Sequence, residues 1–92
     1  MDDLKELRKK IDSIDEQILL LLGERVKVCR DIGVAKKKQG APIRDAEREN
    51  EVYQHIKAKA ARLSLDSMQV EAVYREIVNM CSSVQDLKEK SE

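Results

Sequence analysis

Charged and amide side chains stand at several positions where the helical pattern of this 92-residue chain otherwise places apolar residues. Arg25 occupies one such interior position, and a buried guanidinium without a partner is strongly destabilising. Lys36 follows eleven residues later, close to three helical turns, so both cations project from a similar face. The guanidinium fork matches a carboxylate, so the pair predicts a binding site for a small anion. A structural ion pair would also account for Arg25.

Two polar residues later in the chain could join this site. Glu49 precedes Val52 and Tyr53 by three and four residues, so it faces inward with them and either pairs with a cation or contacts a ligand. Gln85 lies four residues after Cys81, at the edge of an apolar stripe. Together these residues predict a cationic pocket with one carboxylate and one amide. Such a pocket can bind a small polyanion and catalyse only reactions that need orientation and electrostatic stabilisation.

Other kinds of site chemistry lack their residues. Cys29 and Cys81 fall on helix stripes, where separate buried thiols are expected, and His55 is expected to face solvent. Two cysteines and one histidine are too few for a four-ligand zinc site or a disulfide framework. A phosphate-binding glycine loop is missing as well. We therefore expect no metal and no cofactor.

Charge and composition argue against nucleic acid and membrane as partners. The chain has 18 Lys plus Arg and 18 Asp plus Glu, so it lacks the net positive charge typical of nucleic-acid binding. The longest apolar run, Ile18 to Leu22, is too short to span a bilayer. The acidic start Met1-Asp2-Asp3 is unlike a signal peptide. A cytoplasmic protein is expected.

An all-α fold of three helices is predicted to position these side chains. One domain over residues 1–92 would hold helices at about 3–39, 46–62 and 67–87. The breaks fall at Gly40-Ala41-Pro42 and at residues 63–67, and Asp45 is a candidate N-cap. The first helix shows a heptad pattern of apolar residues, at Leu4, Leu7, Ile11, Ile14, Ile18, Leu21, Val28, Ile32 and Ala35. The inner faces of the others are Glu49, Val52, Tyr53, Ile56 and Ala60, then Val70, Val73, Ile77, Met80, Cys81, Val84 and Leu87.

The length of the first helix predicts the assembly. About 37 residues make a helix of roughly 55 Å, whereas a compact chain of this size is about 30 Å across. One chain cannot cover such a stripe, so we expect a two-fold dimer. Arg8 lies about 25 Å from Arg25 along its own helix, but in an antiparallel dimer it can approach Arg25 of the other chain. The alternative is a break near Gly23 or Gly33 that gives two shorter helices.

Several short segments follow one another along the chain: Leu7-Arg8-Lys9-Lys10-Ile11-Asp12 with Ile14-Asp15, Leu22-Gly23-Glu24-Arg25, Lys36, Pro42-Ile43-Arg44-Asp45, Glu47-Arg48-Glu49 and Gln85. Taken in this order, they resemble the all-helical chorismate mutases over Leu4 to Gln85. The resemblance implies an intertwined two-fold dimer of three-helix chains, and conversion of chorismate to prephenate in Phe and Tyr biosynthesis. We expect a monofunctional chain that binds this small dianion.

The resemblance also implies which groups perform the reaction. Arg25 and Lys36 of one chain and Arg8 from the partner chain would hold the two carboxylates of chorismate. Lys36 and Gln85 would donate to the ether oxygen, and Glu49 would bind the ring hydroxyl.

Three further positions are carried over from the family as substrate-binding. The Asp45 backbone would join Glu49 at the hydroxyl, and Arg48 would line the pocket. Cys81 stands where relatives often carry a polar residue near a substrate carboxylate, and a thiol is a weaker donor.

Two other functions fit parts of this pattern. An isochorismate pyruvate lyase would share the fold and the cationic pocket, although the resemblance ties a carboxylate at Glu49 to the mutases. A non-catalytic helical dimerisation or regulatory module would favour apolar residues or one Asn in place of Arg25. The sequence leaves open whether the chain docks onto another enzyme of the shikimate pathway.

Overall fold

The computed structural model describes residues 3–90 of the chain, and side chains through Gln85. It consists of three helices, α1 (Leu4–Gln39), α2 (Ala46–Arg62) and α3 (Ser67–Lys90), and the described residues include no strand. The all-α prediction is therefore confirmed. Within this part of the chain, no helix is long and apolar enough to cross a membrane. Leu87, predicted to belong to the third apolar stripe, lies outside the described side chains.

α1 runs without interruption through Gly23 and Gly33, as the continuous heptad pattern predicts. At its start the Asp3 carboxylate accepts from the Glu6 amide at 2.9 Å. At its end Gly40 has φ 69°, a left-handed conformation that costs glycine little. This conformation lets the Ala41 amide donate to the Lys36 carbonyl at 2.8 Å. The turn stops the helix just beyond Lys36 and sends the chain back toward α2.

α2 and α3 both begin at aspartate caps. The Asp45 carboxylate accepts from the Arg48 amide at 3.0 Å, which confirms the predicted N-cap of α2. The Asp66 carboxylate likewise accepts from the Gln69 amide at 3.0 Å at the start of α3. These caps fix where the two helices start, and thus the direction in which Arg48 and its neighbours project.

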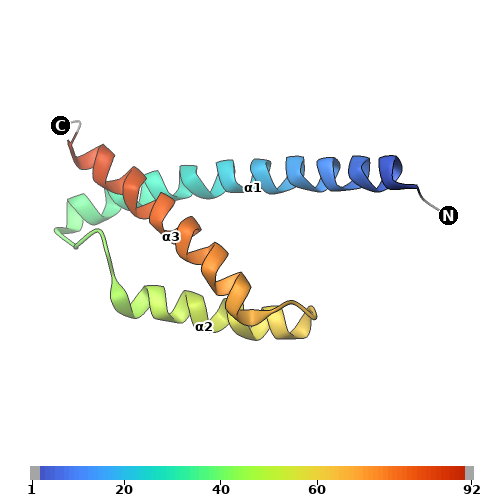
Figure 1. The fold of residues 1–92 in the computed structure, drawn as a ribbon. Helices are drawn as coiled ribbons and strands as arrows, with labels where there is room; N and C mark the ends of the chain where they lie inside the picture. Colours follow the sequence, from blue (N-terminus) through green and yellow to red (C-terminus); the bar gives the residue numbers. More distant parts are fainter. Residues whose placement is uncertain (1–2, 91–92) are drawn as a thin grey trace.

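α3 crosses the molecule diagonally and packs against both other helices (Figure 1). Its N-terminal half lies on α2, where Glu71 pairs with Lys57 at 3.1 Å and accepts from Arg75 Nε at 3.0 Å. The Arg75 guanidinium also lies 4.5 Å from the centre of the Tyr53 ring. The C-terminal half of α3 lies on the last turns of α1. This arrangement makes α3 the only bridge between α1 and α2 among the described helices.

The buried core is small and lies along the two faces of α3. Its apolar members are Cys29, Tyr53, Ala60 and Val78, and Gln85 is buried with them. The inner face predicted for α2 is confirmed, since all five of its residues are buried or half-buried. On α3, Val73 and Met80 are exposed instead, because α3 turns Val78 toward its neighbours.

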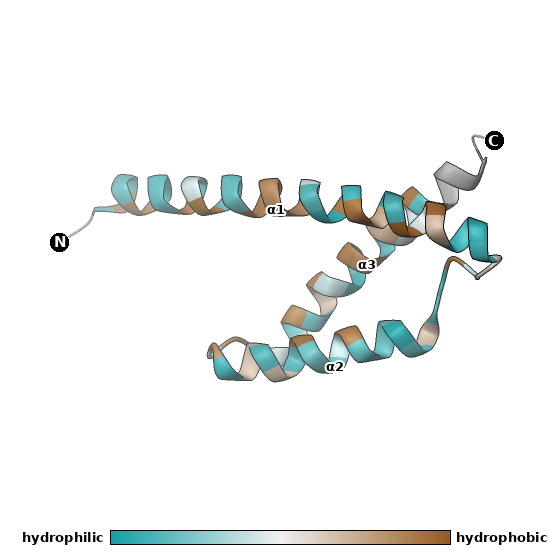
Figure 2. Ribbon diagram, turned by 180° about the vertical axis from the view of Figure 1, so that it is seen from behind, coloured by the Kyte–Doolittle hydropathy of each residue, from teal (hydrophilic) through white to brown (hydrophobic). Residues whose placement is uncertain are grey.

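Most of the apolar stripe of α1 is uncovered. The chain extends over 57 × 27 × 14 Å with a radius of gyration of 16.5 Å, against about 12 Å for a compact chain of this length. Figure 2 shows apolar residues recurring along one side of α1 where it projects beyond α2 and α3. The exposed members are Leu4, Leu7, Ile11, Ile14, Ile18, Leu21, Val28 and Ile32, between 41% and 63% accessible. A surface of this kind is typical of a helix that packs against another chain.

A disulfide joins α1 to α3 at their crossing. Cys29 and Cys81 are bonded, with Cα atoms 5.3 Å apart, although 52 residues separate them in the sequence. The expectation of two separate thiols is therefore wrong. Periodicity placed each cysteine on an inner face, but only the crossing of the two helices decides that these faces meet at the cysteines.

We expect reduction of this disulfide to lower the free energy of unfolding by about 2–4 kcal/mol, since the bond restricts the unfolded chain. Urea unfolding followed by circular dichroism, with and without dithiothreitol at equal chain concentration, measures the difference. Cys29→Ser is the matched control, because its unfolding curve should not respond to the reductant. Coincident wild-type curves in the two conditions would contradict the prediction.

Candidate active site

A cavity of about 390 Å³ lies where the end of α1, the start of α2 and the second half of α3 converge. Its walls combine an apolar part with a group of charged and polar side chains. The apolar part contains Val28, Ile32, Ile43, Val52, Val78 and the disulfide of Cys29 and Cys81. The polar group is Arg25, Lys36, Asp45, Arg48, Glu49, Ser82 and Gln85. Seven of the eight residues predicted for the site thus line one cavity.

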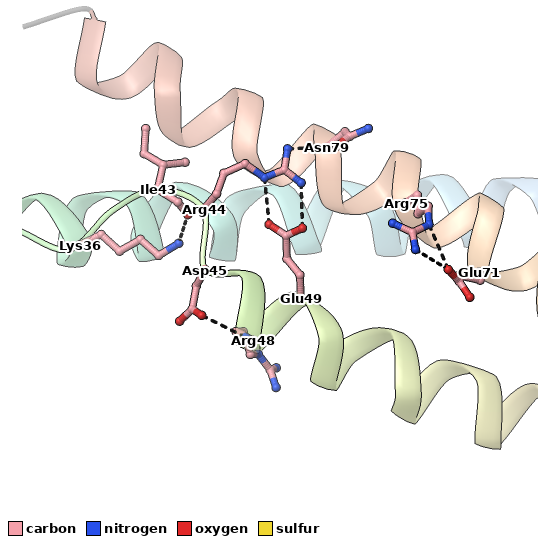
Figure 3. A network of polar contacts seen from close by, with 9 residues as sticks. All are labelled: Lys36, Ile43, Arg44, Asp45, Arg48, Glu49, Glu71, Arg75 and Asn79. Carbon is pink, nitrogen blue, oxygen red and sulfur yellow. Dashed lines mark hydrogen bonds and ion pairs between the residues drawn. The ribbon is translucent and has the colours of Figure 1, made fainter.

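Lys36 lines this cavity from the last turn of α1. Its Nζ donates to the backbone carbonyl of Ile43 and, over 3.0 Å, to Gln85 Oε1 (Figure 3 shows the first of these contacts). Both acceptors are neutral, and no carboxylate among the described side chains pairs with Lys36. The lysine is therefore held in place while its charge stays uncompensated.

Arg25 is the second half-buried cation of the cavity. Its Nη1 lies 3.8 Å from Cys29 Sγ, a weak acceptor. The alternative of a structural ion pair is not found, since none of the described carboxylates pairs with Arg25. A guanidinium and an ammonium that face one cavity without a direct carboxylate partner form a site for an anion.

Gln85 is almost fully buried, with 3% of its surface accessible, rather than at the edge of a stripe. Its Oε1 accepts from Lys36, and its Nε2 lies 3.2 Å from Cys81 Sγ. A sulfur atom competes weakly for an N–H donor, so Nε2 can turn to an incoming oxygen at little cost. Gln85 can pack this closely against α1 because residue 33 is a glycine. A Cβ atom on residue 33 would come within 3.0–3.2 Å of Gln85.

Glu49 pairs with neither cation of the cavity. Its Oε2 accepts from Arg44 Nε at 2.9 Å and its Oε1 from Arg44 Nη2 at 2.9 Å. This pair of hydrogen bonds holds the pKa of the Glu49 carboxyl below its usual value, outweighing the opposing effect of desolvation. The expected alternative in which Glu49 pairs with Arg25 or Lys36 is therefore wrong.

Sequence reasoning did not single out Arg44 or Ser82. Arg44 precedes the α2 cap, so no helical spacing relates it to Glu49. The Ser82 side chain also lines the cavity. It directly follows Cys81, which is the residue that the sequence analysis selected. Since Cys81 is in a disulfide, it has no S–H to donate, and its expected role as a donor to substrate is corrected here.

Asp45 and Arg48 line the cavity and are exposed. The Asp45 carboxylate is committed to the helix cap, and the Arg48 guanidinium lies 3.6 Å from Glu51 in an exposed ion pair. Exposed pairs of this kind are weak. Arg48 is therefore able to turn toward a charged ligand.

Arg8 is absent from the cavity of its own chain. It lies near the start of α1, in a shallow hollow formed with Leu4, Lys5, Lys9 and Asp12. Seventeen residues of continuous helix separate it from Arg25, which is about 25 Å. His55 is exposed, as predicted. The described residues contain no group of His, Cys, Asp or Glu side chains arranged to hold a metal ion.

Comparison with known proteins gives one consistent family. Residues 7–86 match the family described as chorismate mutase type II. A bifunctional chorismate mutase/prephenate dehydratase from Aquifex aeolicus is 43% identical over 92% of this chain and 24% of the relative. A chorismate mutase from Methanocaldococcus jannaschii is 39% identical over 72% of this chain and 67% of that protein. The chain thus spans about a quarter of the first relative and two thirds of the second.

A solved structure shows the same fold. It is a conserved hypothetical protein from Pyrococcus furiosus with a TM-score of 0.71 and 34% identity, covering 89% of this chain and 93% of that one.

We expect Gly33→Ala to destabilise the protein by about 1–3 kcal/mol, because the new methyl group crowds the Gln85 backbone and forces α1 and α3 apart. Gly23→Ala is the matched control on the same helix. No atom lies within 4 Å of its added Cβ, so it should be neutral or stabilise by up to about 1 kcal/mol. Thermal and urea unfolding of both variants test this, and equal stabilities would contradict it.

Proposed function

Since the chain belongs to the chorismate mutase type II family, we propose that it catalyses the rearrangement of chorismate to prephenate. The observation that carries the proposal is the pair of half-buried cations, Arg25 and Lys36, that face the cavity without a carboxylate partner. Chorismate is a dianion, so its two carboxylates supply the missing charge. The relatives named chorismate mutase support this assignment.

The reaction suits a cavity without a nucleophile. It is a one-step pericyclic shift, so no proton is transferred and no covalent intermediate forms. The protein has to select the compact conformer in which the reacting carbons are close together. Cations that bind both carboxylates at a fixed distance from each other would select this conformer. The apolar wall of the cavity would limit the amount of water around the ring.

Stabilisation of the ether oxygen completes the mechanism. Negative charge grows on this oxygen as its bond to carbon breaks, and Lys36 and Gln85 would donate to it. Lys36 Nζ and Gln85 Oε1 are 3.0 Å apart, so the two side chains border a common space. Lys36 is a charged donor. To donate to the ether oxygen, Nε2 of Gln85 would give up only its weak contact with Cys81 Sγ. A donor that is already held in place, as Lys36 is, needs little reorganisation in the transition state.

The remaining polar groups bind the ring side of the substrate. The ionised Glu49 carboxylate and the Asp45 backbone would bind the ring hydroxyl. Arg48 would line the cavity beside them. Cys81 has no S–H group to donate, because it is in the disulfide. Ser82, the next residue, also lines the cavity, and its hydroxyl would donate to the substrate instead.

A second copy of the chain would complete this site. The uncovered stripe of α1 needs an apolar partner, and an antiparallel α1 of the same sequence offers the same stripe. In that arrangement Arg8 of the partner subunit approaches Arg25 and adds a third cation for the carboxylates. Assembly and catalysis would then depend on the same helix.

Lys36→Ala should lower kcat/KM for chorismate by at least ~10²-fold, since it removes a charged donor that is already in place. The assay follows loss of the chorismate diene absorbance and identifies prephenate as the product. Lys38→Ala, which removes an exposed lysine from the same turn, is the control and should leave the rate unchanged. No conversion of chorismate by the wild-type chain would refute the proposed function.

Mixing two inactive variants tests whether each site uses both chains. Arg8→Ala and Arg25→Ala are unfolded together and refolded. Random pairing makes about half of the dimers mixed, and each has one site that carries neither substitution, so about a quarter of wild-type activity should return. If both arginines served the same chain, every site would contain a substitution. Activity no higher than that of the separate variants, with exchange of subunits demonstrated, would contradict the shared site.

A further inference from the structure

The cavity contains a carboxylate among cations, and Glu49 would neutralise one of them unless another group held it. Lys36 on α1 and Arg75 on α3 both favour the ionised form of Glu49 and so lower its pKa, in addition to Arg44 in the loop. A flexible Glu49 would be drawn toward Lys36, because the charge of Lys36 already favours the ionised carboxylate and its hydrogen-bond partners are neutral. That ion pair would occupy the donor that the ether oxygen requires.

Arg44 holds Glu49 from outside the cavity. It is not among the residues that line the cavity, and its side chain is 52% exposed against 22% for Glu49. Its two parallel hydrogen bonds to the carboxylate are each 2.9 Å long. Such a bidentate pair fixes the direction of the carboxylate as well as its distance. Glu49 therefore has the arginine behind it and the cavity in front.

Arg44 is itself anchored to a third element. Its remaining terminal nitrogen, Nη1, donates to Asn79 Oδ1 on α3 at 3.2 Å. Figure 3 shows the guanidinium between Glu49 on α2 and Asn79 on α3. The contact positions Arg44 relative to the helix that also carries Gln85. The carboxylate and the amide of the site are thereby both positioned relative to α3.

We propose that Arg44 is a positioning residue that fixes the Glu49 carboxylate toward the ring hydroxyl of the substrate and away from Lys36. This inference rests on the proposed mutase function and adds a residue outside the cavity to it. Arg44 acts only through Glu49 and touches no reacting atom. Two of its nitrogens orient the carboxylate, and the third ties the arginine to α3.

The lowered pKa of the Glu49 carboxyl gives the idea a signature in pH. Its first cause is the Arg44 hydrogen bond, so loss of Arg44 raises this pKa, with Lys36 and Arg75 still favouring the charged form. Once Glu49 is protonated, it is no longer an anionic acceptor for the hydrogen bond from the ring hydroxyl. The acid side of the kcat/KM profile should consequently move to higher pH when Arg44 is removed.

The test compares Arg44→Gln, Arg44→Lys and the control Arg62→Gln, an exposed arginine at the far end of α2. Arg44→Gln should lower kcat/KM by about 10- to 100-fold, as expected for a displaced catalytic group. Arg44→Lys keeps the positive charge but loses the bidentate guanidinium. It should therefore restore the wild-type pH profile more fully than the wild-type value of kcat/KM. It also serves if Arg44→Gln does not fold. Arg62→Gln should match the wild type.

A double-mutant cycle with Glu49→Gln decides whether Arg44 acts through Glu49. In the Glu49→Gln background, replacing Arg44 by Gln should change kcat/KM by less than about 2-fold. Full additivity of the two substitutions, or wild-type kinetics and pH profile in both Arg44 variants, overturns the inference and leaves the mutase function standing. A wild-type protein that does not convert chorismate overturns the proposed function itself. Carboxyl NMR titration of Glu49 separates the two failures, because it reports the Arg44 contact without any turnover.

Discussion

The close crossing of α1 and α3 is the constraint on which the rest of the structure depends. At Gly33 the two helices approach so tightly that a single added carbon would lie 3.0–3.2 Å from Gln85. One turn earlier on α1, the Cys29–Cys81 disulfide fixes the same crossing covalently. Because Lys36 follows Gly33 by three residues, the crossing also sets the 3.0 Å contact between Lys36 and Gln85. A wider crossing would separate the two donors.

Electrostatic separation is the second organising feature of the molecule. Arg25 and Lys36 are held by neutral atoms, whereas the Glu49 carboxylate, which lines the same cavity, is bound by Arg44 from outside it. Ion pairs elsewhere, such as Lys57 with Glu71, tie α2 to α3 at a distance from this site. The chain has as many acidic as basic residues, yet their arrangement leaves two cations uncompensated in the cavity. Binding of a dianion would restore the balance.

The unpartnered face of α1 connects this site to assembly. The buried core of one chain has few members, and the apolar stripe on α1 remains largely exposed. Covering this stripe would remove large apolar side chains from water, which favours association. Arg8 lies near the start of the helix that ends just beyond Lys36, so in the proposed antiparallel dimer the chain that covers the stripe would also bring a cation toward the cavity.

The sequence by itself determined the three helices, their caps and the inner face of α2. These features follow from local rules, since Gly40 and Asp45 act on neighbouring backbone groups and apolar spacing selects a face. It also identified most of the polar residues that line the cavity. Some followed from a polar group at an interior position, such as Arg25, which is costly without a purpose, and the others from the family resemblance. Only the tertiary structure decided that Cys29 bonds to Cys81, that Arg44 binds Glu49 and that Gln85 is almost fully buried. Each of these depends on where one element crosses another, and the period of a helix defines a direction around its own axis but not the point at which a second helix meets it.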